Sequence, residues 1–136
     1  MYPAELVKPM REHLTQVGFE ELHTAEAVDA IIAKKGTTLI VVNSVCGCAA
    51  ANARPGAIMS LQNAKRPENL TTVFAGVDKE ATDKAREHMI PFPPSSPCVA
   101  LFKDGELVHM LERHHIEGRP AELIAENLID AYNEHC

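Results

Sequence analysis

The stretch TLIVVNSVCGCAAANA, residues 38–53, decides the fold. It begins with an apolar, β-branched segment, continues through the triplet Cys46-Gly47-Cys48 and ends in an alanine-rich segment. β-Branched residues favour strands, and alanine favours helices. The pattern therefore predicts a buried strand, a tight turn and a helix, with two thiols at the point where the strand passes to the helix N-terminus.

This placement gives the two cysteines their expected chemistry. The free N–H groups and the dipole of a helix N-terminus stabilise negative charge, and the thiolate is the reactive form of cysteine. Residues two apart in a regular helix point to nearly opposite sides, so a Cys46–Cys48 disulfide requires a non-helical turn, which Gly47 permits. We expect the small ring to be strained and easily reduced, as suits a site that cycles between thiol and disulfide.

Length and composition limit the class of protein. The chain has 136 residues, 46% of them hydrophobic, so we expect one domain spanning residues 1–136. Its formal net charge of −6 argues against nucleic acids and anionic membranes as partners. The first residues carry no signal-peptide pattern, and no apolar run is long enough to cross a bilayer. We therefore expect a cytoplasmic protein, in which structural disulfides are rare.

Several elements are expected before the triplet. Apolar residues at helical spacing predict a helix over residues 5–17, within an N-terminal extension of residues 1–18. Residues 19–22 fit a short edge strand. Thr24 is suited to cap a second helix. The nearly continuous apolar run at residues 37–45 predicts a central strand that is covered on both faces.

The elements after the triplet complete an α/β pattern. Pro55 predicts a kink in the helix that follows Cys48, residues 70–77 form a second buried strand, and Asp78 is suited to cap the next helix. Asp-Gly between two apolar runs predicts a hairpin over residues 98–111, and Pro120 opens a C-terminal helix. The expected apolar stripe of that helix is Leu123, Ile124, Leu128, Ile129 and Tyr132. This order predicts an α/β sandwich with one mixed sheet.

The order of elements, with a Cys pair between a central strand and a kinked helix, resembles the thioredoxin fold. Residues 77–80 and the run SPCVALFKDGELV, residues 96–108, are particularly similar to thioredoxins. The resemblance implies a three-layer sandwich around a central mixed β-sheet, with an extra N-terminal helix, and a cis-proline at Pro97. Two positions depart from the thioredoxin pattern. Val45 stands where thioredoxins have tryptophan, and Ile40 stands in place of their buried aspartate, so backbone amides are left to activate the thiols.

A second resemblance, to the bacilliredoxin family, covers essentially the whole chain. The motifs that carry it are VNSVCGCAA at 42–50, FAGVDKEAT at 74–82, PSSP at 94–97, Arg113-His114, IEG at 116–118 and His135-Cys136. It implies a thiol–disulfide oxidoreductase that removes the small thiol bacillithiol from mixed disulfides on client proteins, with weak disulfide-isomerase activity and no bound cofactor. The partners are then bacillithiol and S-bacillithiolated proteins. By the same resemblance Cys46 is the attacking thiol and Cys48 the resolving one.

The rest of the candidate site has alternative interpretations. We expect Gly47, Ser96 and Pro97 to shape a groove that holds the substrate disulfide near Cys46. Arg54 either faces water, as charged residues on helices usually do, or attracts the carboxylates of a small thiol. The Arg54 side chain is therefore a candidate substrate-binding group.

A different class of function also fits part of the pattern. The Cys-Gly-Cys pair could belong to a non-catalytic metal-binding or redox-sensing module, but zinc usually takes four ligands and no second cluster of the right spacing is visible, so we expect no metal. His114-His115 fits a solvated loop. Cys98 is either a small buried apolar residue or a third redox-active sulfur. Cys136 is either an idle terminus or a docking or redox residue.

Overall fold

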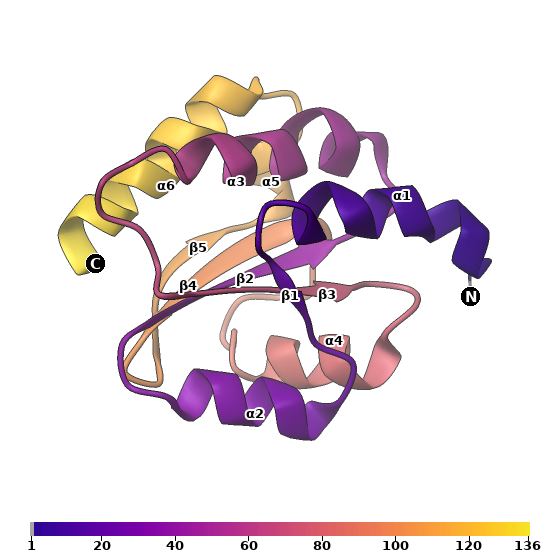
Figure 1. Ribbon diagram of the computed structural model, residues 1–136, viewed down its shortest axis with the longest axis horizontal. Coiled ribbons are helices and arrows are strands. Elements are labelled where there is room, and N and C mark those ends of the chain that lie inside the picture. The colour runs from indigo at the N-terminus through magenta and orange to yellow at the C-terminus, as the bar shows by residue number, and fades with distance from the viewer. Residues whose placement is uncertain (1) are drawn as a thin grey trace.

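The computed structural model describes residues 2–136 and contains one mixed five-stranded sheet between layers of helices (Figure 1). The strand order is β1-β3-β2-β4-β5. The first three strands in the chain are parallel, whereas β4 pairs antiparallel with β2 and β5 pairs antiparallel with β4. Their bounds are β1 Glu20–Glu21, β2 Thr37–Asn43, β3 Asn69–Phe74, β4 Cys98–Lys103 and β5 Glu106–Leu111.

Helices cover both faces of this sheet (Figure 1). One layer holds α2 and α4, and the other holds α1, α3 and α6. The helices are α1 Ala4–Thr15, α2 Ala25–Ala33, α3 Arg54–Ser60, α4 Lys79–Glu87, α5 Arg113–Ile116 and α6 Ala121–His135. The α/β class, the three layers and the added N-terminal helix are therefore confirmed.

Strand β2 is the centre of the sheet and leads to the Cys triplet. All seven of its residues are buried, because β3 and β4 flank it and helices cover both faces; Ile40, for example, lies between Thr71 and Ala100. The strand ends at Asn43. It therefore delivers Cys46 to the edge of the sheet formed by the carboxyl ends of the parallel strands, where ligands bind in open α/β sheets.

Close packing fixes the helix that follows the triplet. Helix α3 lies directly against α6, since a Cβ atom built on Gly56 would lie only 2.5 Å from Cγ2 of Ile124. At the far end of the contact, Ser60 Oγ and Tyr132 OH share a hydrogen bond of 2.9 Å. The close packing of α3 against α6 also shows that the predicted apolar stripe of α6 is partly wrong. Leu123 is 51% exposed, and the buried positions include the smaller residues Ala125 and Ala131.

The local signals around the other elements are mostly confirmed. Thr24 caps α2 by accepting a hydrogen bond from the amide of Ala27. The hairpin turns at Asp104 and Gly105, both at positive φ, as a two-residue hairpin turn requires.

One expected cap is wrong. Asp78 precedes α4, but its side chain makes no cap hydrogen bond. The carboxylate instead accepts hydrogen bonds from both Nη atoms of Arg11, at 2.9 and 3.1 Å, and from the amide of Phe74 at 3.3 Å. A bidentate charged partner competes successfully with a backbone amide. Asp78 therefore ties helix α1 to the loop after β3.

Candidate active site

The turn that carries Cys46 is held by short polar side chains at the end of β2. The amide of Ser44 donates to Asn43 Oδ1 at 2.9 Å, and the amide of Cys46 donates to Ser44 Oγ at 3.1 Å. The carbonyl of Cys46 then accepts from the amide of Ala49 at 3.0 Å. These bonds turn the chain from strand to helix within a few residues and place Cys46 at the start of the helix.

At the position of the predicted kink, the helix after Cys48 contains a wider, π-helical turn. Residues Ala49–Ala53 form a π-helical segment, η1, before α3 begins at Arg54. Pro55 has no N–H to donate to the carbonyl four residues earlier, and the amide of Arg54 instead reaches Ala49 O, five residues back. Such π-turns often occur at functional sites.

The two thiols have different acidities. Burial acts to raise the pKa of Cys46, but hydrogen bonds from the Cys48 thiol and from the amides of Cys48 and Ala49, together with the charge of Arg113, hold that pKa below its usual value. The amide of Cys48 lies 3.3 Å from Cys46 Sγ. Burial, the hydrogen bond to Cys46 and the negative charge of its thiolate raise the pKa of Cys48. Cys46 is therefore the more acidic thiol of the pair.

At any given pH a larger fraction of Cys46 than of Cys48 is therefore in the thiolate form, which is the more nucleophilic form of cysteine. Both side chains are half-buried and Gly47 between them is exposed. Gly47 is not at positive φ, and an added Cβ would meet no atom within 4 Å. The conformational freedom expected of Gly47 is therefore not used in the dithiol form.

Ser96 lines the same cavity as Cys46, and the buried Pro97 follows it directly in the chain. The Ser96–Pro97 peptide bond is cis, as the thioredoxin resemblance implies. Arg113 holds this loop from α5: its amide donates to Ser95 Oγ at 3.3 Å, and its Nη1 donates to the carbonyl of Ser96 at 3.2 Å. Ser96, Arg113 and Cys46 line one cavity of about 310 Å³.

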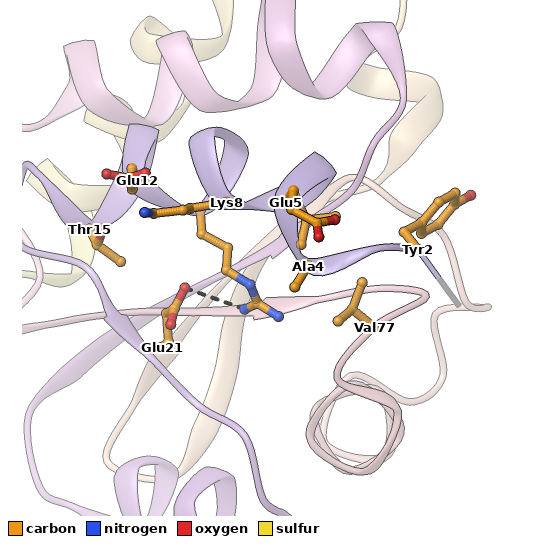
Figure 2. Close-up of a pocket in the computed structure, with 10 residues that line it drawn as sticks. Tyr2, Ala4, Glu5, Lys8, Glu12, Thr15, Glu21 and Val77 are labelled. Carbon is orange, nitrogen blue, oxygen red and sulfur yellow. Dashed lines mark hydrogen bonds and ion pairs between the residues drawn. The ribbon is translucent and has the colours of Figure 1, made fainter.

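A second, larger hollow does not contain the thiols. Figure 2 shows it beside α1. Its volume is about 600 Å³. Arg11 and Glu21 form an ion pair of 3.3 Å at its wall. Tyr2 lines both cavities, but none of the residues around the larger one is a cysteine. Of these two cavities, Cys46 therefore lines the smaller one.

Arg54 does not lie where the sequence suggested. The residue is 4% exposed, so it neither faces water nor can reach a small thiol in the cavity. Its Nη1 donates to Asn43 Oδ1 at 2.8 Å and to Ser44 O at 3.2 Å, and its Nε donates to His13 Nδ1 at 3.1 Å. Burial lowers the pKa of Arg54. Arg54 therefore stabilises the turn from inside the protein. The buried oxygens Asn43 Oδ1 and Ser44 O, at the end of β2, require a hydrogen-bond donor, and Arg54 supplies it.

The remaining cysteines have different surroundings from Cys46 and Cys48. Cys98 is buried on β4, opposite Val42 of β2, and burial raises its pKa to about 12. This fits the expected small apolar role. Cys136 is exposed, and burial of its sulfur still raises its pKa.

One group of three possible metal ligands occurs within residues 2–136. Glu112, His114 and His115 form it, and it contains neither Cys46 nor Cys48. His115 Nδ1 accepts the amide proton of Glu112, so a neutral ring carries its own proton on Nε2, the atom that faces His114. These three residues form the start of α5, with a capping box between Glu112 and His115, and not the predicted loop. Their donor atoms are used within the protein.

Arg86 is a residue of the site that no sequence motif indicated. It lies on α4 and lines the same cavity as Cys46 and Arg113. Only the Arg113-His114 motif of the family resemblance hinted at Arg113, and no local pattern marked Arg86, because both arginines reach the cavity through the tertiary fold.

Comparison with known proteins agrees with this geometry. The model of the disulphide isomerase family matches residues 2–136. A bacilliredoxin of Cytophaga hutchinsonii is 60% identical over 134 residues, covering 98% of this chain and 99% of that protein. The chain belongs to the bacilliredoxin family. A bacilliredoxin of Halalkalibacterium halodurans is 54% identical and covers 99% of this chain and 94% of its own length.

Solved structures give the same fold. Mitochondrial thioredoxin 3 of Saccharomyces cerevisiae aligns with a TM-score of 0.61 at 17% identity, over 90% of this chain and 98% of that one. A putative oxidoreductase with a thioredoxin fold aligns with a TM-score of 0.63 at 17% identity, over 76% and 89%. This bacilliredoxin-family chain is thus a thiol–disulfide oxidoreductase of the thioredoxin fold. Among residues 2–136 no helix combines the length and apolar character needed to span a membrane.

Proposed function

We propose that this protein removes bacillithiol from mixed disulfides on client proteins. The Cys46 thiolate attacks the bacillithiol sulfur, a Cys46–bacillithiol bond forms, and the client sulfur leaves as a thiolate that takes a proton from solvent. Cys48 then loses its proton and attacks Cys46 Sγ, which releases bacillithiol and leaves a Cys46–Cys48 disulfide. A second bacillithiol can release the first instead. The client gains two electrons and the Cys pair loses them.

One observation carries this proposal: the lowered pKa of Cys46 beside the raised pKa of Cys48, with Cys46 at the wall of a cavity. A low-pKa attacking thiol with a protonated neighbour suits transfer followed by resolution. The bacilliredoxin names of the relatives support bacillithiol as the small thiol. The name of the matching family supports a weaker disulfide-isomerase activity, which uses the same exchange chemistry.

In this proposed mechanism Cys46 is the attacking thiol, Cys48 is the resolving thiol, and Gly47, Ser96 and Pro97 surround the substrate disulfide.

A non-catalytic redox sensor is the second candidate function, because oxidation of an easily oxidised Cys pair could change the conformation that a partner protein contacts. A sensor would take up oxidant without transferring the small thiol from a client. Turnover of a mixed disulfide therefore separates the two functions.

The test uses a peptide with one cysteine joined to bacillithiol, and a matched peptide joined to glutathione. Wild-type protein should release the bacillithiol peptide in its reduced form, and Cys48→Ala should carry one bacillithiol on Cys46, detected by mass spectrometry. Cys136→Ala is the matched control and should behave as wild type. Adducts on Cys98 or Cys136, or faster reaction with the glutathione peptide, would contradict the proposal.

A further inference from the structure

The cavity beside Cys46 has a composition that the thiol chemistry alone does not explain. Its volume of about 310 Å³ is at the lower end of the range for small-molecule sites. Nine residues line it, two of them arginines and none acidic. The whole chain has a formal net charge of −6, so this cavity reverses the overall sign of the protein next to its nucleophile.

Arg86 supplies the first positive charge, from α4. Its Nε is buried and has no hydrogen-bond partner among residues 2–136, and the guanidinium forms no ion pair with any residue in that range. Buried donors in folded proteins are nearly always paired, and an unpaired one needs an explanation. An incoming acceptor in the cavity that Arg86 lines supplies that partner.

Arg113 supplies the second charge, from α5. Its Nη1 donates a hydrogen bond to Ser96 O at 3.2 Å, and its Nε donates one to a carboxylate oxygen of Glu117 at 3.3 Å. Its side chain is exposed at the mouth of the cavity, and its charge also acts on both thiols. These hydrogen bonds hold Arg113 next to Ser96, where its positive charge is close to a group bound to Cys46.

We propose that Arg86 and Arg113 form an anion subsite that binds the carboxylates of a low-molecular-weight thiol while its sulfur is exchanged at Cys46. Arginine suits this task because its planar fork binds a carboxylate through two parallel hydrogen bonds. The subsite deepens the proposed function, since it names carboxylate-bearing small thiols as the preferred class. A neutral thiol of similar size gains nothing from it.

The test compares two model substrates that differ only in this charge. A peptide cysteine is joined either to 3-mercaptopropionate, which carries a carboxylate, or to 2-mercaptoethanol, which is neutral, and a third peptide carries bacillithiol. The rate of transfer to Cys46 is measured in the Cys48→Ala background. Wild type should prefer the carboxylate over the neutral substrate by about tenfold, the effect of one charge-assisted hydrogen bond.

Substitution of the arginines should remove that preference. Arg86→Gln should lower the rate with the carboxylate and bacillithiol substrates by about tenfold and change the neutral rate less than twofold. Arg113→Gln should do the same after correction for the intrinsic reactivity of Cys46, measured with neutral iodoacetamide. Arg66→Gln, far from the cavity lining, is the matched control and should keep the wild-type preference.

The outcomes separate the two proposals. Equal losses with the charged and neutral substrates, or an unchanged preference in both variants, would overturn the anion subsite. Failure of wild type to accept bacillithiol while it still prefers 3-mercaptopropionate would overturn the proposed function and leave the subsite intact. Should Arg86→Gln fail to fold, as judged by circular dichroism, Arg86→Lys decides: it keeps the charge and should keep part of the preference.

Discussion

Arg54 and Arg86 come from helices on opposite faces of the sheet. Arg54 donates a hydrogen bond to the turn before Cys46, and Arg86 lines the cavity beside Cys46, so their guanidinium groups are used differently. Arg54 donates to Asn43, Ser44 and His13 and is fully enclosed. Arg86 lines an open cavity and keeps a buried Nε without a partner among residues 2–136. A satisfied buried cation stabilises structure, whereas an unsatisfied one at a cavity is available to a ligand. The burial of an arginine therefore does not reveal its role; its hydrogen-bond partners do.

The largest expected effect lies at Cys46 itself. Cys46→Ala should lower removal of the small thiol by more than about 10³-fold, because the thiol with the lowered pKa is lost. Neither Arg54 nor Arg86 offers a replacement nucleophile. The measurement is release of reduced peptide from a bacillithiol mixed disulfide. Residual turnover in Cys46→Ala above that of Cys46→Ala/Cys48→Ala would assign the attack to Cys48.

The stability of two variants tests the difference between the arginines directly. Arg54→Met should destabilise the fold by about 3 kcal/mol, because Asn43 Oδ1 and Ser44 O lose their buried donor. Arg86→Met should change the free energy of unfolding by less than about 1 kcal/mol, because no bond within the described protein is lost. Urea unfolding of the reduced proteins measures both. Equal destabilisation would mean that Arg86 is also a structural residue.

The pH dependence of alkylation tests the charge of Arg113 on Cys46. Since that charge lowers the pKa of Cys46, Arg113→Gln should move the inflection of the alkylation rate to higher pH and leave the alkaline plateau in place. At neutral pH the variant should react more slowly. The lowered pKa of Cys46 also adds to the free energy of unfolding at alkaline pH. This contribution is lost as the pH falls through the pKa of Cys46 in the folded protein.

Alkylation is followed with iodoacetamide in a Cys48→Ala background, so that the coupled thiol does not contribute. Arg66→Gln serves as the control and should leave the inflection in place. An inflection that does not move in Arg113→Gln would mean that the amides of Cys48 and Ala49 alone set the acidity of Cys46.

The smallest effect is expected at Gly47. Because an added Cβ meets no atom, Gly47→Ala should leave the stability of the dithiol form within about 1 kcal/mol of wild type. Closure of the Cys46–Cys48 disulfide should become slower, since that step requires the turn to leave its helical conformation. Stopped-flow oxidation with a small disulfide measures the closure, and an unchanged closure rate would show that the glycine is not needed for it.

Local patterns predicted the fold well and the cavity poorly. The apolar run of β2, the Asp104-Gly105 hairpin and the cap at Thr24 all depend on neighbours in sequence, and all were confirmed. Arg86 could not be found in this way, because it meets Cys46 only through packing of α4 on the sheet. The residues that line a cavity assembled from separate elements have no regular spacing in the sequence, so no local pattern can reveal them.

The errors have physical causes of the same kind. Asp78 has the sequence of a cap, but Arg11 from a distant helix is a stronger partner than a helix amide. Leu123 fits the apolar period of α6, but contact at Gly56 turns that helix so that alanines face the core. Arg54 is charged and helical, so exposure was the natural expectation. The polar residue Asn43, at the end of an otherwise buried strand, was the signal that a buried donor had to reach it.

Helix α1 limits how far this active site can be transplanted. The carbonyl of Met10 accepts from Asn43 Nδ2 at 3.1 Å, and His13 accepts from Arg54, so the added helix is part of the wall behind the nucleophile. Grafting the Cys-Gly-Cys triplet alone onto another thioredoxin domain carries none of these supports. A working transplant has to bring Asn43, Arg54 and His13 from three separate elements. The smallest portable form of the site is therefore not a loop but the domain together with its N-terminal helix.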